Sequence, residues 1–287
     1  MKNLVIGYLW SGKKLGKEEK IFLKVAKKKN IRLIMINIFK NIDENQLEQK
    51  LKDCKIVYNN VAEEFAIEYV KTIEEWGKKV IDSSEVYYYT EDKWMFFLKC
   101  KEKNIPTPET ILLCENITLA KKELKNFNKW PVILKRVEGT CGEFVEKAQN
   151  LEEAGKIIRK FWKKGCERHP IIAQEFIDSP SYRVTVIGKK IAQAIIKENK
   201  SGWKATGVHA KKFKKFKVDK NLKKLVKRIR ELAKINICGI DFVKKGKNWI
   251  VLEVNAQPAF DFVEKERERL IYLTLNLLQE EAKKAKI

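Results

Sequence analysis

Two oxygen-bearing side chains near the end of the chain have the type and spacing of metal ligands. Glu253 and Asn255 interrupt the otherwise apolar run WIVLEVNAQPAF. Residues two apart on a strand point to the same face, so this carboxylate and this amide are expected to point together. The opposite face is expected to be apolar and to carry Ile250, Leu252 and Val254. Such a pair fits either a half-exposed polar strand face or a site for a hard cation.

The preceding residues predict a hairpin that adds a third oxygen ligand. The stretch CGIDFVKKGKNWIVLEVN indicates two strands joined by a turn-like linker, residues 244–248. If Val243 pairs with Trp249, then Asp241 lies opposite Val251 and on the same face as the two side chains above. A β-bulge would change this register. Two carboxylates and an amide form the oxygen-only set that Mg²⁺ prefers, with phosphate oxygens and water completing the shell.

Length and composition favour a soluble, unexported protein. The 287 residues can bury a large core, and no apolar run reaches the roughly 18 residues that a membrane span needs. The six cysteines form no CxxC pair, which argues against a zinc ribbon or a disulfide framework. We therefore expect a cytoplasmic protein with reduced thiols.

The chain is strongly basic, with 61 Lys and Arg against 38 Asp and Glu and a formal net charge of +23. This imbalance attracts anionic metabolites, acidic proteins or nucleic acid. The lysines are spread along the polar faces of predicted helices, which also fits a solvated surface with no specific partner. No RNP, helix-turn-helix or C₂H₂ pattern is present, so nucleic acid is a minor alternative.

The order of predicted elements indicates an α/β domain followed by α+β structure. A strand over 3–9, a helix over 17–29 and a strand over 31–38 form a βαβ opening, typical of a parallel sheet. The prediction is a small parallel-sheet N-terminal domain over 1–88. A central lobe is expected over 89–170 and a C-terminal lobe over 171–287, both α+β.

Two stretches could contact phosphate. GYLWSGKK nearly matches a P-loop, but Lys14 stands where Ser or Thr would ligate Mg²⁺, so we interpret it as a basic loop. In PVILKRVEGTCGEFV, Lys135 ends an apolar strand, while Gly139 and Gly142 permit close approach of backbone N–H groups to phosphate. An exposed turn beside a boundary lysine would show the same pattern.

Taken in order, several motifs resemble the ATP-grasp superfamily and, within it, the RimK-like carboxylate-amine ligases. They are SSEVYYYTEDKW with NIPTPETILL, WPVILKRVEGTCG, IIAQEFIDSPSYRVTVIG, and GIDFV followed by VLEVNAQP. The resemblance implies an ATP-grasp fold whose two α+β lobes clamp ATP behind the N-terminal domain. It also implies an ATP- and Mg²⁺-dependent ligase that adds glutamate or a similar amino acid to a carboxylate acceptor through an acyl phosphate.

The resemblance also implies site residues, carried over position by position. Arg183 and Lys135 would be catalytic, and two Mg²⁺ ions, or Mn²⁺, would be held by Asp241, Glu253 and Asn255. The ATP-binding set would be Lys93, Lys135, Gly139, Thr140, Cys141, Gly142, Gln174, Glu175, Phe176, Ile177 and Lys204.

Some positions depart from the pattern of these relatives. Glu143 stands where they have a third loop glycine, Ser181 where they have an acid, and Lys204 and Thr206 in place of an Arg-x-Asn segment. The glutamate preference and the ligase activity therefore stay open, and an ATP-grasp-like protein that binds nucleotide without ligation is the alternative. The expected partners are an amino acid and an anionic acceptor, either a small molecule or an acidic peptide or carrier protein. We also expect a homodimer or homotetramer and no membrane association.

Overall fold

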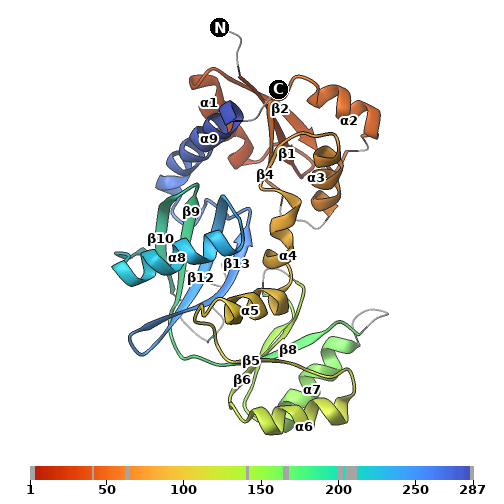
Figure 1. Cartoon of the computed structure of the whole chain (residues 1–287), viewed down its shortest axis with the longest axis vertical. Coiled ribbons are helices and arrows are strands. Elements are labelled where there is room, and N and C mark those ends of the chain that lie inside the picture. The colour runs from red at the N-terminus through yellow and green to blue at the C-terminus, as the bar shows by residue number, and fades with distance from the viewer. Residues whose placement is uncertain are drawn as a thin grey trace.

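The computed structural model shows three β-sheets arranged along the molecule (Figure 1). It describes residues 4–40, 42–61, 65–139, 142–163, 168–198, 203 and 212–284. No helix in these ranges is both long and apolar enough to cross a lipid bilayer.

The first sheet is parallel, as the βαβ pattern predicts, with strand order β2-β1-β3-β4. Helices α1 and α9 pack together on one face, although they lie at opposite ends of the chain (Figure 1). Helices α2 and α3 pack on the other face. The bounds are β1 (Leu4–Trp10), α1 (Lys17–Lys28), β2 (Ile31–Asn37), α2 (Glu44–Leu51), β3 (Ile56–Asn59), α3 (Phe65–Glu75), β4 (Val80–Ile81) and α9 (Arg267–Lys284).

The second sheet is antiparallel, with order β5-β8-β6-β7, and lies farthest from the first sheet in Figure 1. Helices α6 and α7 cover one face, and Asn116 and Asn150 cap their first turns through side-chain oxygens. The bounds are β5 (Thr110–Leu112), α6 (Ile117–Phe127), β6 (Val132–Arg136), β7 (Val145–Ala148), α7 (Leu151–Trp162) and β8 (Ile171–Glu175).

The third sheet is also antiparallel, with order β11-β10-β9-β12-β13. Helix α8, capped by Asp219, packs with α4 and α5 against one face of this sheet. The other face points toward the second sheet. The bounds are α4 (Tyr87–Thr90), α5 (Lys93–Glu102), β9 (Ser181–Ile187), β10 (Lys190–Glu198), β11 (Lys212–Lys215), α8 (Lys220–Leu232), β12 (Ile237–Lys245) and β13 (Asn248–Ala256). Short 3₁₀ turns span Ser84–Val86 and Glu264–Glu266.

The structure excludes a P-loop at GYLWSGKK. Gly7 lies inside β1 rather than at the start of a loop. A Cβ added there would sit 2.6 Å from the Cδ2 atom of Leu51 on α2, so this glycine permits helix and sheet to pack closely.

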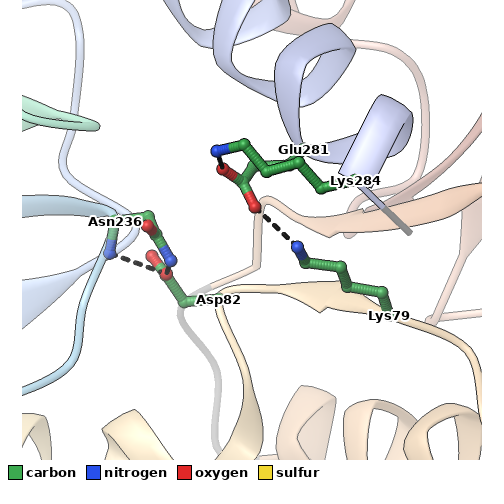
Figure 2. Close-up of polar contacts among 5 residues, drawn as sticks. All are labelled: Lys79, Asp82, Asn236, Glu281 and Lys284. Atoms are coloured by element: carbon green, nitrogen blue, oxygen red, sulfur yellow. Dashed lines mark hydrogen bonds and ion pairs between the residues drawn. The ribbon is translucent and has the colours of Figure 1, made fainter. Parts of the chain in front are cut away.

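A buried carboxylate ties the first sheet to the third. Asp82, just after β4, accepts hydrogen bonds from the backbone N and the Nδ2 of Asn236, both at 2.8 Å (Figure 2). It also accepts one from the backbone N of Ile237 at 2.9 Å. Beside it, Glu281 of α9 lies 2.6 Å from both Lys79 and Lys284. Burial raises the pKa of Asp82 from 3.8 to about 6, although the three hydrogen bonds oppose this shift.

Asp82→Asn is expected to alter how stability depends on pH. The pKa of the Asp82 carboxyl is near 3.8 in the unfolded chain and about 6 in the folded protein. Between pH 3.8 and pH 6, the folded state therefore binds more protons at this group than the unfolded state does. The stabilisation from this group is therefore lost as pH rises from about 4 to about 6. The difference in free energy of unfolding between wild type and Asp82→Asn should shrink by about 2–3 kcal/mol over this interval, as measured by urea unfolding.

Asp53→Asn, which changes an exposed aspartate after α2, is the matched control and should show no such trend. A difference between wild type and Asp82→Asn that stays constant from pH 4 to 6.5 would mean that the three donors keep Asp82 ionised throughout.

Candidate active site

A cavity of about 620 Å³ lies between the second and third sheets and collects the residues singled out in the sequence. Its walls include strand residues of β6, β8, β9, β12 and β13 and the first residue of α5. Predicted site residues that line it are Lys93, Lys135, Gly139, Gly142, Gln174, Glu175, Phe176, Ile177, Arg183, Asp241, Glu253 and Asn255. Thr140, Cys141 and Lys204 fall outside the described residues, as does Thr206.

The hairpin β12–β13 carries the acidic centre, but in a register different from the predicted one. The turn is only Gly246 and Lys247, and Val243 pairs with Ile250 rather than Trp249. Gly246 has φ +61°, which explains a glycine in so tight a turn. The longer linker and the pairing inferred from sequence were therefore wrong.

A β-bulge in this hairpin decides which side chains meet. The register shifts between Asp241 and Phe242, so Asp241 lies opposite Glu253 and not opposite Val251. The bulge also brings Leu252 to the cavity wall beside Glu253, against the prediction that it faces the core. The shared face of the two carboxylates was thus predicted correctly, but the bulge places them as direct cross-strand neighbours.

Asn255 completes the oxygen set. Its Nδ2 lies 3.3 Å from Glu253 Oε1 and 3.5 Å from the carbonyl oxygen of Gly239, so both contacts involve the amide nitrogen. Among the described residues, no three His, Cys, Asp or Glu side chains gather closely enough to hold a metal alone. Two carboxylates and an amide therefore fit a hard cation whose remaining ligands are phosphate oxygens and water.

Two buried cations hold Asp241. Arg183 Nη1 lies 2.9 Å from Oδ2, and Lys197 Nζ lies 2.8 Å from Oδ1. Burial opposes ionisation of Asp241, but these neighbours outweigh it, so the pKa of this carboxyl lies below its ordinary value. Lys197 was not among the site residues predicted from the sequence, although it lies near the end of an apolar strand as Lys135 does, a pattern that could have identified it.

Lys135 faces the acidic centre from the second sheet. Its Nζ donates to Gln174 Oε1 at 2.8 Å, and Gln174 Nε2 donates in turn to Thr110 Oγ1 at 3.0 Å. Burial lowers the pKa of Lys135, while Glu253 opposes this shift. The hydrogen-bond chain from Thr110 thus directs the Lys135 ammonium group into the cavity.

Lys93 lines the cavity beside Gly139. At the first position of α5, its Nζ lies 2.6 Å from the carbonyl oxygen of Gly139 and 3.3 Å from that of Val137. Gly139 and Gly142 both have positive φ angles, +129° and +72°, in a region that favours glycine. Lys93, Gly139 and Gly142 thus all line the same cavity, and Lys93 contacts the backbone of Gly139.

Apolar and aromatic side chains form the opposite part of the cavity. Ile133, Val145 and Leu252 supply aliphatic walls, and the rings of Phe176 and Trp203 meet edge to face with centroids 6.3 Å apart. Phe176 and Ile177, which follow β8, line the same cavity. Trp203 was not among the site residues predicted from the sequence.

The departures from the pattern of the relatives lie at the cavity or beside it. Ser181 is buried in the cavity wall, where an acid was expected from the resemblance. Glu143 follows Gly142; burial lowers the pKa of Arg136, and the charge of Glu143 opposes this shift.

If Asp241 holds Mg²⁺, as the sequence predicts, Lys197→Met should strengthen Mg²⁺ binding. Lys197 already occupies Oδ1 of Asp241 and adds positive charge, so its removal frees an oxygen and makes the acidic centre more negative. The Mg²⁺ concentration that half-saturates ATP binding should fall about 3- to 10-fold, measured by calorimetry. Lys160→Met, which removes an exposed ion pair with Glu146, is the control. An unchanged Mg²⁺ dependence would show that Asp241 contributes nothing to cation binding.

Comparison with known proteins assigns the part of the chain that forms this cavity to a family. The family model of the RimK-like ATP-grasp domain matches residues 90–276. The chain belongs to the RimK-like ATP-grasp family. These residues include every described side chain of the cavity named above.

Curated relatives of this RimK-like chain are ligases. It is 27% identical over 209 residues to the alpha-aminoadipate--LysW ligase LysX of Saccharolobus solfataricus, covering 71% of this chain and 75% of that protein. It is 24% identical over 193 residues to a probable alpha-L-glutamate ligase of Haemophilus influenzae, covering 66% of this chain and 62% of that protein. ATP-dependent ligation is thus the activity of the family.

Solved structures show that the fold is the ATP-grasp fold. A RimK domain ATP-grasp protein from Sphaerobacter thermophilus matches with a TM-score of 0.77 at 16% identity, covering 95% of this chain and 98% of that one. The D-alanine--D-alanine ligase of Bacillus anthracis, complexed with ATP, matches with a TM-score of 0.75 at 14% identity and 98% coverage of both chains.

Proposed function

We propose that this protein is an ADP-forming carboxylate-amine ligase that uses ATP and Mg²⁺. The observation that carries the proposal is the meeting of an acidic centre and a set of buried cations in one cavity between two lobes. Phosphates bound among such cations need divalent metal to offset the remaining charge, and the acidic centre is placed to hold it. Family membership supports the same chemistry.

Each side chain then has a role. Asp241, Glu253 and Asn255 would hold Mg²⁺, two ions or Mn²⁺ in its place, and bound metal supplies charge neutralisation at the phosphates. Lys93 and Lys135 would bind phosphate oxygens. Glycines 139 and 142, with residues 140 and 141 between them, would close over the phosphates, and Lys204 would add a cation. The segment Gln174–Ile177 would border the adenine ring, a role supported by its place beside the apolar walls.

The reaction needs no protein nucleophile. A carboxylate oxygen of the acceptor attacks the γ-phosphorus as the bond to ADP breaks, which forms an acyl phosphate. The amine nitrogen then attacks the acyl carbon, and phosphate leaves as the amine loses a proton. The Arg183 guanidinium would stabilise charge on the transferring phosphoryl group and on the acyl phosphate, a role that suits its planar and permanently charged form.

Glutamate or a closely related amino acid is the proposed amine. The named relatives are ligases of alpha-aminoadipate with LysW and of L-glutamate, which supports an acidic amino acid as a substrate class. Ser181, Lys204 and Thr206 differ from the pattern of these ligases, so we propose a shifted preference among acidic amino acids. They also support the second candidate, a nucleotide-binding protein that does not ligate.

An anionic acceptor, such as an acidic peptide or carrier protein, fits the surface charge. Besides the net charge of +23, a groove of about 740 Å³ lies between the β9–β10 hairpin and α8. Its described lining has five basic side chains and a single carboxylate, over an apolar floor: Lys189, Lys190, Lys223, Lys227, Arg230, Glu231, Val186, Ile191 and Val226. Acceptor turnover that weakens steeply with salt would support this partner class.

The deciding experiment is Mg²⁺-dependent ADP release from ATP, with glutamate, alpha-aminoadipate and a pool of carboxylate acceptors each added or omitted. Release that needs both an amino acid and an acceptor would establish the ligase. MgATP binding without stimulated release would favour the nucleotide-binding protein, and salt-sensitive binding of nucleic acid without MgATP binding would favour the nucleic-acid alternative. The cytoplasmic location, the dimer or tetramer, and the division at 1–88, 89–170 and 171–287 stay predictions.

A further inference from the structure

The backbone conformation at Gly239 does not require glycine. It lies inside β12, is buried, and is not among the described glycines with positive φ. Glycine in a strand interior is unfavourable because it costs conformational entropy and packs no side chain, so it often marks a place where another group approaches the backbone closely.

The group that approaches is the Arg183 guanidinium. A Cβ added to Gly239 would sit 2.2 Å from both Nε and Nη2 of Arg183 and 2.3 Å from its Cζ. The sheet register explains the contact: Asp241 pairs with Arg183 and Gly239 with Thr185, so Gly239 is two residues before Asp241 on the same strand face. The arginine side chain therefore lies along the sheet surface over Gly239.

Two other groups hold the same guanidinium. Asp241 Oδ2 binds Nη1 at 2.9 Å, and the Phe262 ring centroid lies 5.7 Å from Cζ. Arg183 Nε makes no hydrogen bond within the described part of the chain, as expected for a group that lies against the bare Gly239 backbone. The guanidinium is thus held at one end by a carboxylate and occupies the space where a Cβ of residue 239 would lie.

We propose that Gly239 is a positioning residue for phosphoryl transfer. Because it has no side chain, it leaves the space that the Arg183 guanidinium occupies. This inference rests on the proposed role of Arg183 in the ligase reaction. Arg183 is 7% exposed, and moving its guanidinium away from Gly239 changes its ion pair with Asp241 and its contact with Phe262. A side chain added at Gly239 would meet Arg183 and not the second-sheet residues proposed to bind nucleotide.

Gly239→Ala tests the proposal. We expect ADP release to fall at least about 10-fold in kcat, while the KM for ATP stays within about 3-fold, because the displaced arginine acts in the transition state. Gly155→Ala on α7 is the matched control, since the nearest atom to its added Cβ is the flexible end of Lys121, outside the cavity. Unchanged ADP release in Gly239→Ala would overturn the proposal.

A thermal-unfolding cycle with Arg183→Ala gives a readout that does not depend on activity. Gly239→Ala should lower Tm by about 2–6 °C in the wild-type background. It should leave Tm unchanged in the Arg183→Ala background, where no guanidinium competes with the new methyl group for space. Equal Tm losses in both backgrounds would mean that Gly239 acts through another neighbour and would overturn the proposal. If the wild type releases no ADP, the proposed ligase function is wrong. The Tm cycle alone then decides whether Gly239 leaves the space that Arg183 occupies.

Discussion

Glu253→Gln is expected to reduce Mg²⁺-dependent ADP release by about 10³-fold, which corresponds to about 4 kcal/mol of transition-state stabilisation. The bulge places Glu253 directly opposite Asp241, and Gln keeps its shape while removing its charge. An amide is a much weaker ligand for a hard cation than a carboxylate. Steady-state ADP release, measured over a range of Mg²⁺ concentrations, checks this prediction.

Glu268→Gln is the matched control for this change. It alters the same functional group on α9, where, within the described ranges, it pairs with exposed Lys24 and Lys28, and surface pairs of this kind contribute little. ADP release and its Mg²⁺ dependence should therefore equal those of wild type. If Glu253→Gln also behaved as wild type, the acidic centre would have no part in metal-dependent chemistry, and the proposed reaction would be wrong.

Arg183→Lys is expected to lower kcat for ADP release by about 10²- to 10³-fold with little change in the KM for ATP. The guanidinium can bind Asp241 through Nη1 and still present further N–H donors toward a phosphoryl group. The lysine ammonium is a point charge on a differently shaped side chain, and it cannot satisfy both geometries. Single-turnover ADP release with saturating MgATP measures the transfer step directly.

The exposed Arg168 provides the comparison for Arg183→Lys. Arg168→Lys lies outside the cavity and should leave the transfer step unchanged. Calorimetric MgATP binding by Arg183→Lys should match wild type, which would show that the protein is folded and the nucleotide seated. A uniform loss of ATP affinity, with kcat preserved, would assign Arg183 to nucleotide binding instead of transfer.

Local sequence patterns were enough to predict several elements and which residues lie together. Period-two and helical patterns predicted the βαβ opening of the parallel N-terminal sheet and the hairpin that carries Asp241 and Glu253, because local burial and turn chemistry govern those choices. The spacing of Glu253 and Asn255 put them on one strand face. Separated motifs in the right order then identified the family, and the described residues that they indicated line a single cavity.

Tertiary structure decided the features that depend on residues far apart in the chain. The bulge at Asp241 cannot be inferred from alternation, because one extra residue reverses which side chains share a face. Lys197 became a site residue only because β9 pairs between β10 and β12, which lets Lys197 Nζ reach Asp241 Oδ1, and such strand pairing cannot be inferred from local sequence. Gly239 looked like an ordinary strand glycine until the Arg183 side chain was seen to lie over it.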